Sequence, residues 1–503
     1  MFEGQPKGLY ALALANTGER FGYYTMLAVF ALFLGENFGF AAGTASEIYT
    51  WFLALVYFLP LFGGMLADKF GYSKMVVVGI FIMFFGYLLL SVPLGSSAMA
   101  VGAMLAALLL VSAGTGLFKG NLQVMVGDLY NDPKYADKRD SGFSLFYMAI
   151  NIGALFAPTA AIAIMDWAQE SLGYSKADSY HFAFAVACVS VIASILIFYA
   201  FKSTFQHVTD KKKEAKTAVA QETVKEDPKD TKERIVCLCL VYAVVIFFWM
   251  AFHQNGLTLT FFADEYTATS SHGIESMMFD VTNIIGVIFI VYALFQIFQS
   301  KTKLGKLISA AVIVIAVAFL WYKYSTLSAE GVAVSAPIFQ QFNPCFVVLL
   351  TPFSIALFSY LGKKGKEPKA PVKIGLGMLV AAGAYLLMTV GCVGLPAADP
   401  VNHTHQADVT PNLLVSTYLI LTFAELLLSP IGISFVSKVS PAKYKGMMMG
   451  GWFVATAVGN KLVAIPGHMW GMDLTYVWGV LMIICLLAAA FIFSVIKKLN
   501  KVA

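Results

Sequence analysis

The chain has 503 residues, of which 59% are hydrophobic and only 13% are charged. Soluble domains carry about 25% charged residues, so this composition and the mean hydropathy of +0.75 exclude a soluble enzyme or binding domain. They predict a polytopic membrane protein. The net charge of +5 comes from basic loops between apolar runs and therefore gives no indication of nucleic-acid binding.

Apolar runs of about 17 to 25 residues, long enough to cross a bilayer, predict about fourteen spans. The spans begin near Leu9, Ile48, Met75, Ala98, Ser141, His181, Arg234, Val281, Lys306, Ile338, Ile374, Asn412, Gly446 and Leu474. Lys, Glu, Asp and Thr dominate residues 203–233, which predicts a charged linker. We therefore expect a six-helix unit at 1–202 and a second unit at 234–503, with an inserted helix pair at about 280–325.

Basic residues outside the spans gather in alternate connections. They include Lys69 and Lys74, Lys134 to Arg139, Lys211 to Arg234, Lys301 and Lys303, Lys363 to Lys369, Lys438 to Lys445, and Lys497 to Lys501. Because positively charged loops stay on the cytoplasmic side, we expect both termini in the cytoplasm and the chain in the plasma (inner) membrane. The first apolar run carries its charges in the middle and has no small-residue cleavage site, which favours a retained helix over a signal peptide.

The first span contains an acid and a base side by side, Glu19 and Arg20. A charge at membrane depth is tolerated only when it faces a partner, the protein interior or a water-filled cavity. Asn16, Tyr23 and Tyr24 share the helical face of this pair. Two hypotheses stay open at this point: a polar pathway through the protein, or a self-neutralising pair that only locks helices together.

Single polar residues interrupt several other spans. Lys119 is either a cavity cation or a lysine that snorkels to the interface, and for Lys461, nearer a span end, we expect snorkelling. Glu425 is an unpaired acid inside an apolar run, which favours a functional role. Tyr147 and Asn151 lie one turn apart and suit a ligand contact or helix-to-helix hydrogen bonds equally well.

Two further features predict no polar site. The six cysteines lie in or beside apolar spans without the spacing of a zinc site or a disulfide framework, so we expect core thiols and neither metal nor cofactor. Residues 284–298 and 307–320 of the inserted pair are almost wholly apolar. Such helices offer nothing to a polar ligand, so we expect them at the periphery, against lipid or a partner.

Several short sequence motifs, taken in their order along the chain, resemble those of the proton-coupled oligopeptide transporter (POT/PTR) family of the major facilitator superfamily. The resemblance extends over almost the whole chain. The pieces are Glu19-Arg20-Phe21 with Tyr23-Tyr24, Tyr57 with Pro60 and the run from Gly63 to Asp68, Lys119, Phe146 to Gly153, Gln341 to Pro344, Glu425 with Ser429-Pro430, and Trp452. The resemblance implies an all-α fold of two six-helix bundles plus two extra transmembrane helices. It also implies a transporter rather than an enzyme, one that imports di- and tripeptides with protons by alternating access.

The resemblance implies roles for particular residues by position. The peptide carboxylate is received, or coupled to protonation, by Arg20 and Lys119. The peptide amine is held by Asn151, Asn343 and Glu425. The pocket is lined by Tyr23, Tyr24, Tyr57, Tyr147 and Trp452. For proton coupling we expect Glu19 as the main site, acting through Arg20 and Lys119, with His253 as a polar wall of the cavity or an alternative proton carrier.

The chain departs from the family pattern at four places. Asn16 replaces the first acid of the helix 1 motif, Leu27 replaces a second arginine, and His253 replaces the acid before Gln254. The family's extra helix pair precedes the seventh helix, whereas the pair at 280–325 follows it. Another small zwitterion or an anion, with altered or absent proton coupling, therefore remains an alternative substrate class.

Two other classes of membrane protein fit the sequence less well. A substrate sensor is expected to add a signalling domain, which the short termini do not provide. A channel needs a continuous polar face, whereas polar residues here interrupt many different spans. We accordingly expect peptide, protons and the lipid bilayer as partners, no nucleic acid, and a monomeric transporter.

Overall fold

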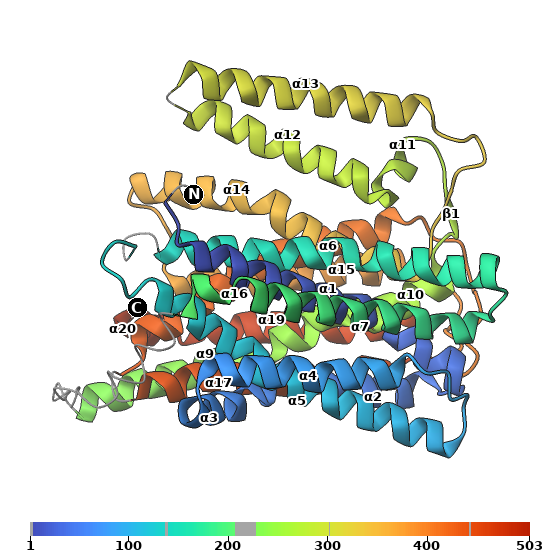
Figure 1. Cartoon of the computed structure of the whole chain (residues 1–503), viewed down its shortest axis with the longest axis horizontal. Helices are drawn as coiled ribbons and strands as arrows, with labels where there is room; N and C mark the ends of the chain where they lie inside the picture. The colour runs from blue at the N-terminus through green and yellow to red at the C-terminus, as the bar shows by residue number, and fades with distance from the viewer. Residues whose placement is uncertain (1–3, 136–138, 207–227, 301, 442–443, 503) are drawn as a thin grey trace.

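The computed structural model describes residues 4–135, 139–206, 228–300, 302–441 and 444–502. In this part of the chain, thirteen helical segments are long and apolar enough to cross a membrane. The helix α1 (Lys7–Phe38) is outside that set, but its 32 residues match the span expected near Leu9. The expected all-helical, polytopic fold class is therefore confirmed, and Figure 1 places both termini at the same end of the molecule.

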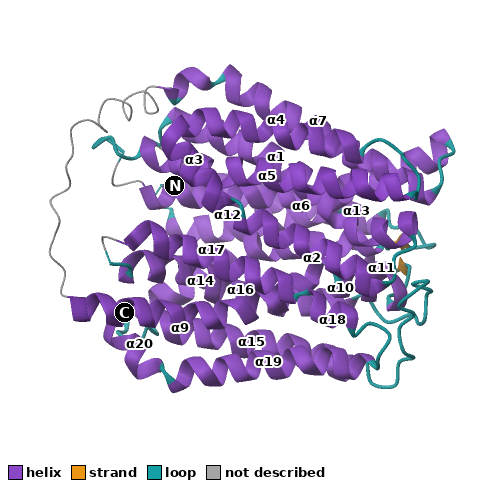
Figure 2. Ribbon diagram, turned by 90° about the horizontal axis from the view of Figure 1, so that it is seen from below, coloured by secondary structure: helices purple, strands orange, loops and turns teal. Residues whose placement is uncertain are grey.

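The N-terminal half is formed by α1 to α7. Its other helices are α2 (Ala42–Phe58), α3 (Pro60–Phe70), α4 (Tyr72–Leu90), α5 (Ala98–Leu129), α6 (Arg139–Leu172) and α7 (Lys176–Ala200), followed by the 3₁₀ turn η2 (Lys202–Thr204). Figure 2 shows α1, α4, α5 and α7 in one half of the molecule and α9, α15, α16 and α19 in the other.

The C-terminal half begins with α9. Its helices are α9 (Pro228–Phe252), α10 (Thr258–Tyr266), α11 (Gly273–Ser276), α12 (Val281–Gln299), α13 (Lys303–Ser325), α14 (Phe342–Lys363), α15 (Ala370–Gly391), α16 (Asn412–Val439), α17 (Lys445–Leu462), α18 (Ala464–His468), α19 (Leu474–Ser494) and α20 (Ile496–Val502). The 3₁₀ turns are η3 (His253–Gly256), η4 (Met277–Phe279) and η5 (Ala336–Gln341), and the strands β1 (Ser270–Ser271) and β2 (Val332–Ala333) pair antiparallel.

The charged linker expected at 203–233 is shorter than the sequence suggested. The helix α9 already begins at Pro228, where proline suits the first helical position because its missing N–H is not needed there. Asp230 in the first turn forms an ion pair with Arg234 at 3.2 Å. The remainder of the linker, residues 207–227, lies outside the described residues.

The inserted pair α12–α13 lies at the edge of the molecule, as Figure 1 shows. α13 packs against α12, and α12 in turn contacts α14 and α6. Val317 on α13 is 51% exposed, and large apolar side chains such as Leu307 and Ile315 are 68% exposed. A helix that is apolar on every side is covered by lipid or protein. The expectation of a peripheral pair is thus confirmed.

Two membrane-crossing segments are broken near their middle. The first break separates α2 from α3 at Pro60, whose ring cannot continue the hydrogen-bond ladder of a helix. The second separates α9 from α10 at η3, and the Gln254 side chain stabilises it. Its amide nitrogen donates to the Met250 and Val463 carbonyls at 3.0 and 3.2 Å, and its oxygen accepts from Thr258 at 2.6 Å.

The two halves are bonded to each other at the end of the molecule away from the termini. Glu47 of α2 accepts from Lys461 of α17 at 2.5 Å and pairs with His468 of α18 at 2.8 Å. Close by in the fold, the Ala42 amide donates to the Pro400 carbonyl at 2.7 Å. Lys461, for which we expected snorkelling, therefore pairs with an acid in the other half, a partner that the sequence did not predict.

We predict that Glu47→Gln weakens this junction between the halves. Gln cannot form the two ion pairs, so the outer ends of α2 and α18 should separate in a larger fraction of molecules. Electron paramagnetic resonance distances between spin labels at Thr44 and Met472 should lengthen or broaden. Glu36→Gln is the matched control, because Glu36 is equally exposed (39% for both side chains) but pairs with Lys176 within the N-terminal half. Equal distance distributions for both variants would contradict the assignment.

Candidate functional site

Glu19 and Arg20 form a two-pronged ion pair inside the N-terminal half. Arg20 donates from Nε to Glu19 Oε2 at 2.5 Å and from Nη2 to Oε1 at 2.6 Å. Both side chains are buried, with exposures of 0% for Glu19 and 3% for Arg20. A buried charge is strongly destabilising unless it is paired and hydrogen-bonded. The pair therefore makes it possible for α1 to carry both charges through the membrane.

Arg20 and Lys119 both lie against tyrosine rings. The Arg20 guanidinium carbon is 4.5 Å from the ring centroid of Tyr23, and Tyr23 meets Tyr24 edge to face at 5.3 Å. The Lys119 ammonium lies over the Tyr57 ring at 3.9 Å. An aromatic face attracts a cation, and more strongly where water is excluded. The rings thus help to hold both cations in place.

Close packing of α3 on α5 decides where Lys119 lies. A Cβ added at Gly63 would sit 2.1 Å from the backbone oxygen of Gly116, so only glycine permits this approach. The Asn121 side chain donates to the Gly63 carbonyl at 3.1 Å across the same contact. α5 continues to Leu129, well beyond Lys119. Lys119 therefore lies within the helix and not at its end, and its role as a cavity cation stays a prediction.

The acidic side of the site is Glu425 on α16. Its Oε2 accepts from Asn343 Nδ2 at 2.9 Å, and the same nitrogen donates to Thr422 at 3.1 Å. Glu425 is 8% exposed. It interacts electrostatically with Tyr24 and Tyr57 of the N-terminal half. The acid of one half thus lies within electrostatic range of tyrosines of the other half.

His253 lies where α9 is interrupted, between aromatic rings of both halves. Its ring centroid is 4.9 Å from that of Trp249 and 6.0 Å from that of Tyr57. Phe252 meets it edge to face at 5.6 Å. His253 also interacts electrostatically with Lys119. The substitution of an acid by histidine thus falls beside the lysine cation.

The remaining expected pocket residues differ in solvent exposure. Tyr147 on α6 is 49% exposed and interacts electrostatically with Glu425. Asn151 is 8% exposed, and its amide nitrogen donates to the Tyr147 carbonyl one turn earlier at 3.1 Å. Trp452 is 3% exposed and is packed on Gly432 of α16, where an added Cβ would lie 2.2 Å from the indole ring. Trp452 is therefore a covered wall next to the helix of Glu425.

Two residues of this region were not predicted from the sequence. The Asn343 amide nitrogen donates to Thr422 as well as to Glu425. Thr422 lies three residues before Glu425 and therefore on the same helical face, a spacing from which its place in the site could have been predicted. Trp249 stacks edge-on against His253. It lies four residues earlier, so the same spacing rule applies, but a tryptophan in an apolar helix is expected in any membrane span.

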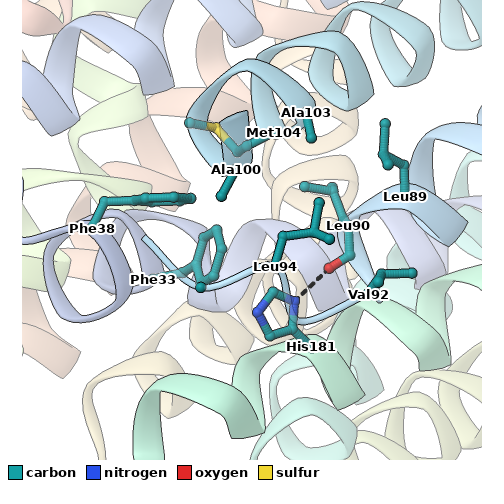
Figure 3. A pocket seen from close by; sticks show the side chains of 11 residues that line it. Phe33, Phe38, Leu89, Leu90, Val92, Leu94, Ala100, Ala103, Met104 and His181 are labelled. Carbon is teal, nitrogen blue, oxygen red and sulfur yellow. Dashed lines mark hydrogen bonds between the residues drawn. The ribbon is translucent and has the colours of Figure 1, made fainter. Parts of the chain in front are cut away.

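Two hollows elsewhere are unsuited to a polar ligand. Figure 3 shows the first, a cavity of about 20 Å³ at the outer ends of α1, α4, α5 and α7, where His181 Nδ1 lies 2.6 Å from the Leu90 carbonyl. It has room for about one water molecule, whereas ligand pockets typically span about 300 to 1,000 Å³. The second, of about 300 Å³, lies between α9 and α19 and is lined only by apolar residues such as Phe247 and Leu487.

Comparison with known proteins decides the family. The family profile described as PTR2, POT family, matches residues 73–224 and 315–469, which is more than half of the chain. The chain belongs to the POT family. The unmatched stretch between these ranges, residues 225–314, contains α9 to α12 and the first half of α13. Membership confirms the resemblance derived from the sequence and identifies the protein as a transporter, not an enzyme.

Relatives and solved structures agree with this assignment. The chain is 30% identical over 487 residues to the uncharacterized transporter YclF of Bacillus subtilis (strain 168), covering 92% of this chain and 88% of that protein. It is 27% identical over 496 residues to a di-/tripeptide transporter of Lactococcus lactis subsp. lactis (strain IL1403), covering 92% and 89%. The fold is similar to a crystal structure of peptide transporter POT in complex with sulfate, with a TM-score of 0.74, 23% identity, and coverage of 100% and 96%.

We predict that Gly63→Ala destabilises the contact that positions Lys119. Its methyl group would overlap the backbone of α5, and overpacking of this kind typically costs about 1 to 3 kcal/mol. The melting temperature of the purified transporter should fall. Gly64→Ala is the matched control, because an added Cβ there has no atom within 4 Å. Equal melting temperatures of both variants would show that α3 and α5 are not closely packed at Gly63.

Proposed function

We propose that this transporter imports di- and tripeptides by proton symport with alternating access. The observation that carries the proposal is the opposition of charge across the two halves. Arg20 and Lys119 supply positive charge from the N-terminal half, and Glu425 supplies negative charge from the C-terminal half. A short peptide is a zwitterion whose two ends suit these two sides. The proposed halves are residues 1–202 and 234–503.

Each end of a bound peptide then meets groups suited to its charge. The carboxylate accepts from Lys119 and from Arg20 once that arginine turns from Glu19, while Tyr57 and Tyr23 keep both cations in place. The ammonium pairs with Glu425, and the oxygens of Asn343 and Asn151 supply further acceptors. Aromatic residues such as Tyr24, Tyr147 and Trp452 give the remaining wall, which suits varied peptide side chains.

Proton coupling follows from competition for Arg20. While Arg20 donates two hydrogen bonds to Glu19, the carboxylate stays charged. When a peptide carboxylate draws Arg20 away, Glu19 is left in an apolar interior, where the neutral protonated form costs least. Binding of peptide thus promotes binding of a proton. His253, beside Trp249 and Lys119, is a polar wall of the cavity in this scheme.

A further part of the proposal concerns orientation and partners. The basic connections predict that the end carrying both termini is cytoplasmic in the plasma membrane. Opening at the opposite end then requires the Glu47 ion pairs to break. Peptide, protons and lipid are the proposed partners, and the transporter works as a monomer. An alternative substrate, another small zwitterion, is favoured by the loss of a cation at Leu27 and of an acid at Asn16.

The direct test of the function is uptake of a labelled dipeptide into liposomes that contain the purified protein. We expect accumulation above the external concentration when a pH gradient is imposed, and only equilibration without one. Uptake that ignores the gradient would point to the uniporter alternative. No uptake of any peptide, together with uptake of a different zwitterion, would replace the proposed substrate class.

We predict that Lys119→Gln and Glu425→Gln each weaken dipeptide binding at least about tenfold. A hydrogen bond to a charged group contributes about 1.5 to 3 kcal/mol, and 1.4 kcal/mol is a factor of ten in affinity. Calorimetry of the purified variants measures the loss. Lys369→Gln and Glu367→Gln are the controls, because Lys369 bonds to Asn500 and Glu367 pairs with Lys373 away from the site. Wild-type affinity in both site variants would refute the charge assignment.

We also predict that Glu19→Gln separates transport from proton coupling. The variant should lose accumulation driven by a pH gradient but keep exchange of labelled for unlabelled peptide, because exchange needs no net proton movement. His253→Gln should keep both activities. Loss of coupling in His253→Gln alone would reverse the roles of the two residues. Coupling that survives in both variants would show that neither residue carries the proton.

A further inference from the structure

The apolar groove between α9 and α19, with a volume of about 300 Å³, opens on the outside of the molecule. Its lining includes Ala243 and Phe247 of α9 and Leu487 and Phe491 of α19. Leu487 is 64% exposed and Phe491 is 39% exposed, and Figure 2 shows α19 along one edge of the molecule. Both helices belong to membrane-crossing segments. In a bilayer the groove therefore faces lipid acyl chains, which are as apolar as its lining.

A cluster of cations lies at the end of the molecule next to this groove. The short helix α20 carries Lys497, Lys498 and Lys501, all of them exposed, and it contains no acid. The Lys369 ammonium donates to the Asn500 carbonyl of the same helix at 2.9 Å and adds a fourth positive charge. We call these four lysines the α20 cluster. Such a surface attracts anions.

Contacts on both helices connect the α20 cluster with the groove. The Phe491 carbonyl accepts from the Val495 amide at 3.3 Å, and α20 begins at the next residue. On the other side of the groove, the Cys237 thiol of α9 donates to the Lys498 carbonyl at 3.8 Å. Ala243 follows six residues later, about 9 Å along the helix. The groove therefore begins within about two helical turns of the cations.

Acids in the same corner do not cancel this charge. The first turns of α9 contain Asp230 and Glu233, and Asp230 already pairs with Arg234 at 3.2 Å. Lys229, Lys232 and Arg234 outnumber these two acids in the same stretch. With the four lysines of the α20 cluster, the described part of this corner carries a net positive charge.

We propose that an anionic phospholipid binds here, with one acyl chain in the groove and its phosphate at the α20 cluster. Basic clusters directly beyond the end of a transmembrane helix attract anionic headgroups. Lysine ammonium groups form charge-assisted hydrogen bonds with phosphate oxygens, and their flexible stems reach the headgroup level. A zwitterionic lipid brings its own cation to the same cluster and therefore binds less tightly. This site is separate from the peptide site and does not depend on proton symport.

The test is native mass spectrometry of the purified transporter, titrated with dioleoylphosphatidylglycerol or with dioleoylphosphatidylcholine. The two lipids have the same acyl chains and differ in headgroup charge, and the wild type should bind the anionic lipid more tightly. Lys497→Gln combined with Lys498→Gln should weaken binding of the anionic lipid at least about fivefold, since one basic residue near the headgroups contributes about that factor. Ala243→Phe should also weaken it, because the larger side chain fills the groove.

The matched controls lie on α13, away from the groove. Lys303→Gln combined with Lys306→Gln removes two exposed lysines, and Ala310→Phe adds the same bulk at an exposed position. Neither control should change the affinity for the anionic lipid. The melting temperature without added lipid reports whether each variant is folded. If Ala243→Phe does not fold, Leu487→Gln tests the groove at an exposed position.

Three results would overturn the proposal. Equal affinity of the wild type for both lipids, or unchanged affinity in the Lys497 and Lys498 variant, would exclude an anionic headgroup at the α20 cluster. Unchanged affinity in the folded groove variant would exclude the acyl chain from the groove. Displacement of the lipid by glycerol 3-phosphate, which has the phosphate without acyl chains, would show a site for free anions instead.

Discussion

The structure depends on one physical constraint, the high free-energy cost of a charge inside a membrane-spanning bundle. Glu19 and Arg20 lower this cost by neutralising each other through two short hydrogen bonds. The Lys119 ammonium is stabilised by the face of the Tyr57 ring. The Glu425 carboxyl accepts a hydrogen bond from the Asn343 amide. In the proposed function, a ligand of opposite charge replaces each of these protein partners. The contacts that stabilise the buried charges are then the ones that a charged substrate would use.

The interrupted helices explain how these groups meet between the halves. A continuous helix in place of α9, η3 and α10 would use its backbone groups internally, whereas the break at His253 brings a polar ring against Tyr57 and Trp249. Gln254 compensates the broken ladder with three hydrogen bonds. Discontinuous helices near the membrane midplane are a common way for transporters to form a site. The apolar pair α12–α13 has no such break and lies outside.

Much of the fold could be predicted from the sequence because apolar length is a strong local signal. The spans, the peripheral pair and the family follow from hydropathy and short motifs. The residues of the site could also be named, since charged and polar residues inside apolar spans are conspicuous; their roles remain predictions. Contacts between distant segments could not be predicted. Lys461 appeared to be an interface lysine because its partner, Glu47, lies in the other half. The start of α9 at Pro228 was hidden by the charged composition around it.

The central claim is that a proton crosses together with the peptide, and proton movement itself tests it most directly. A pH-sensitive dye inside liposomes that contain the transporter reports internal acidification. With no gradient imposed at the start, addition of an external dipeptide is expected to acidify the interior, and liposomes with the Glu19→Gln variant should show no acidification. Entry of labelled dipeptide into wild-type liposomes at constant internal pH would contradict the account.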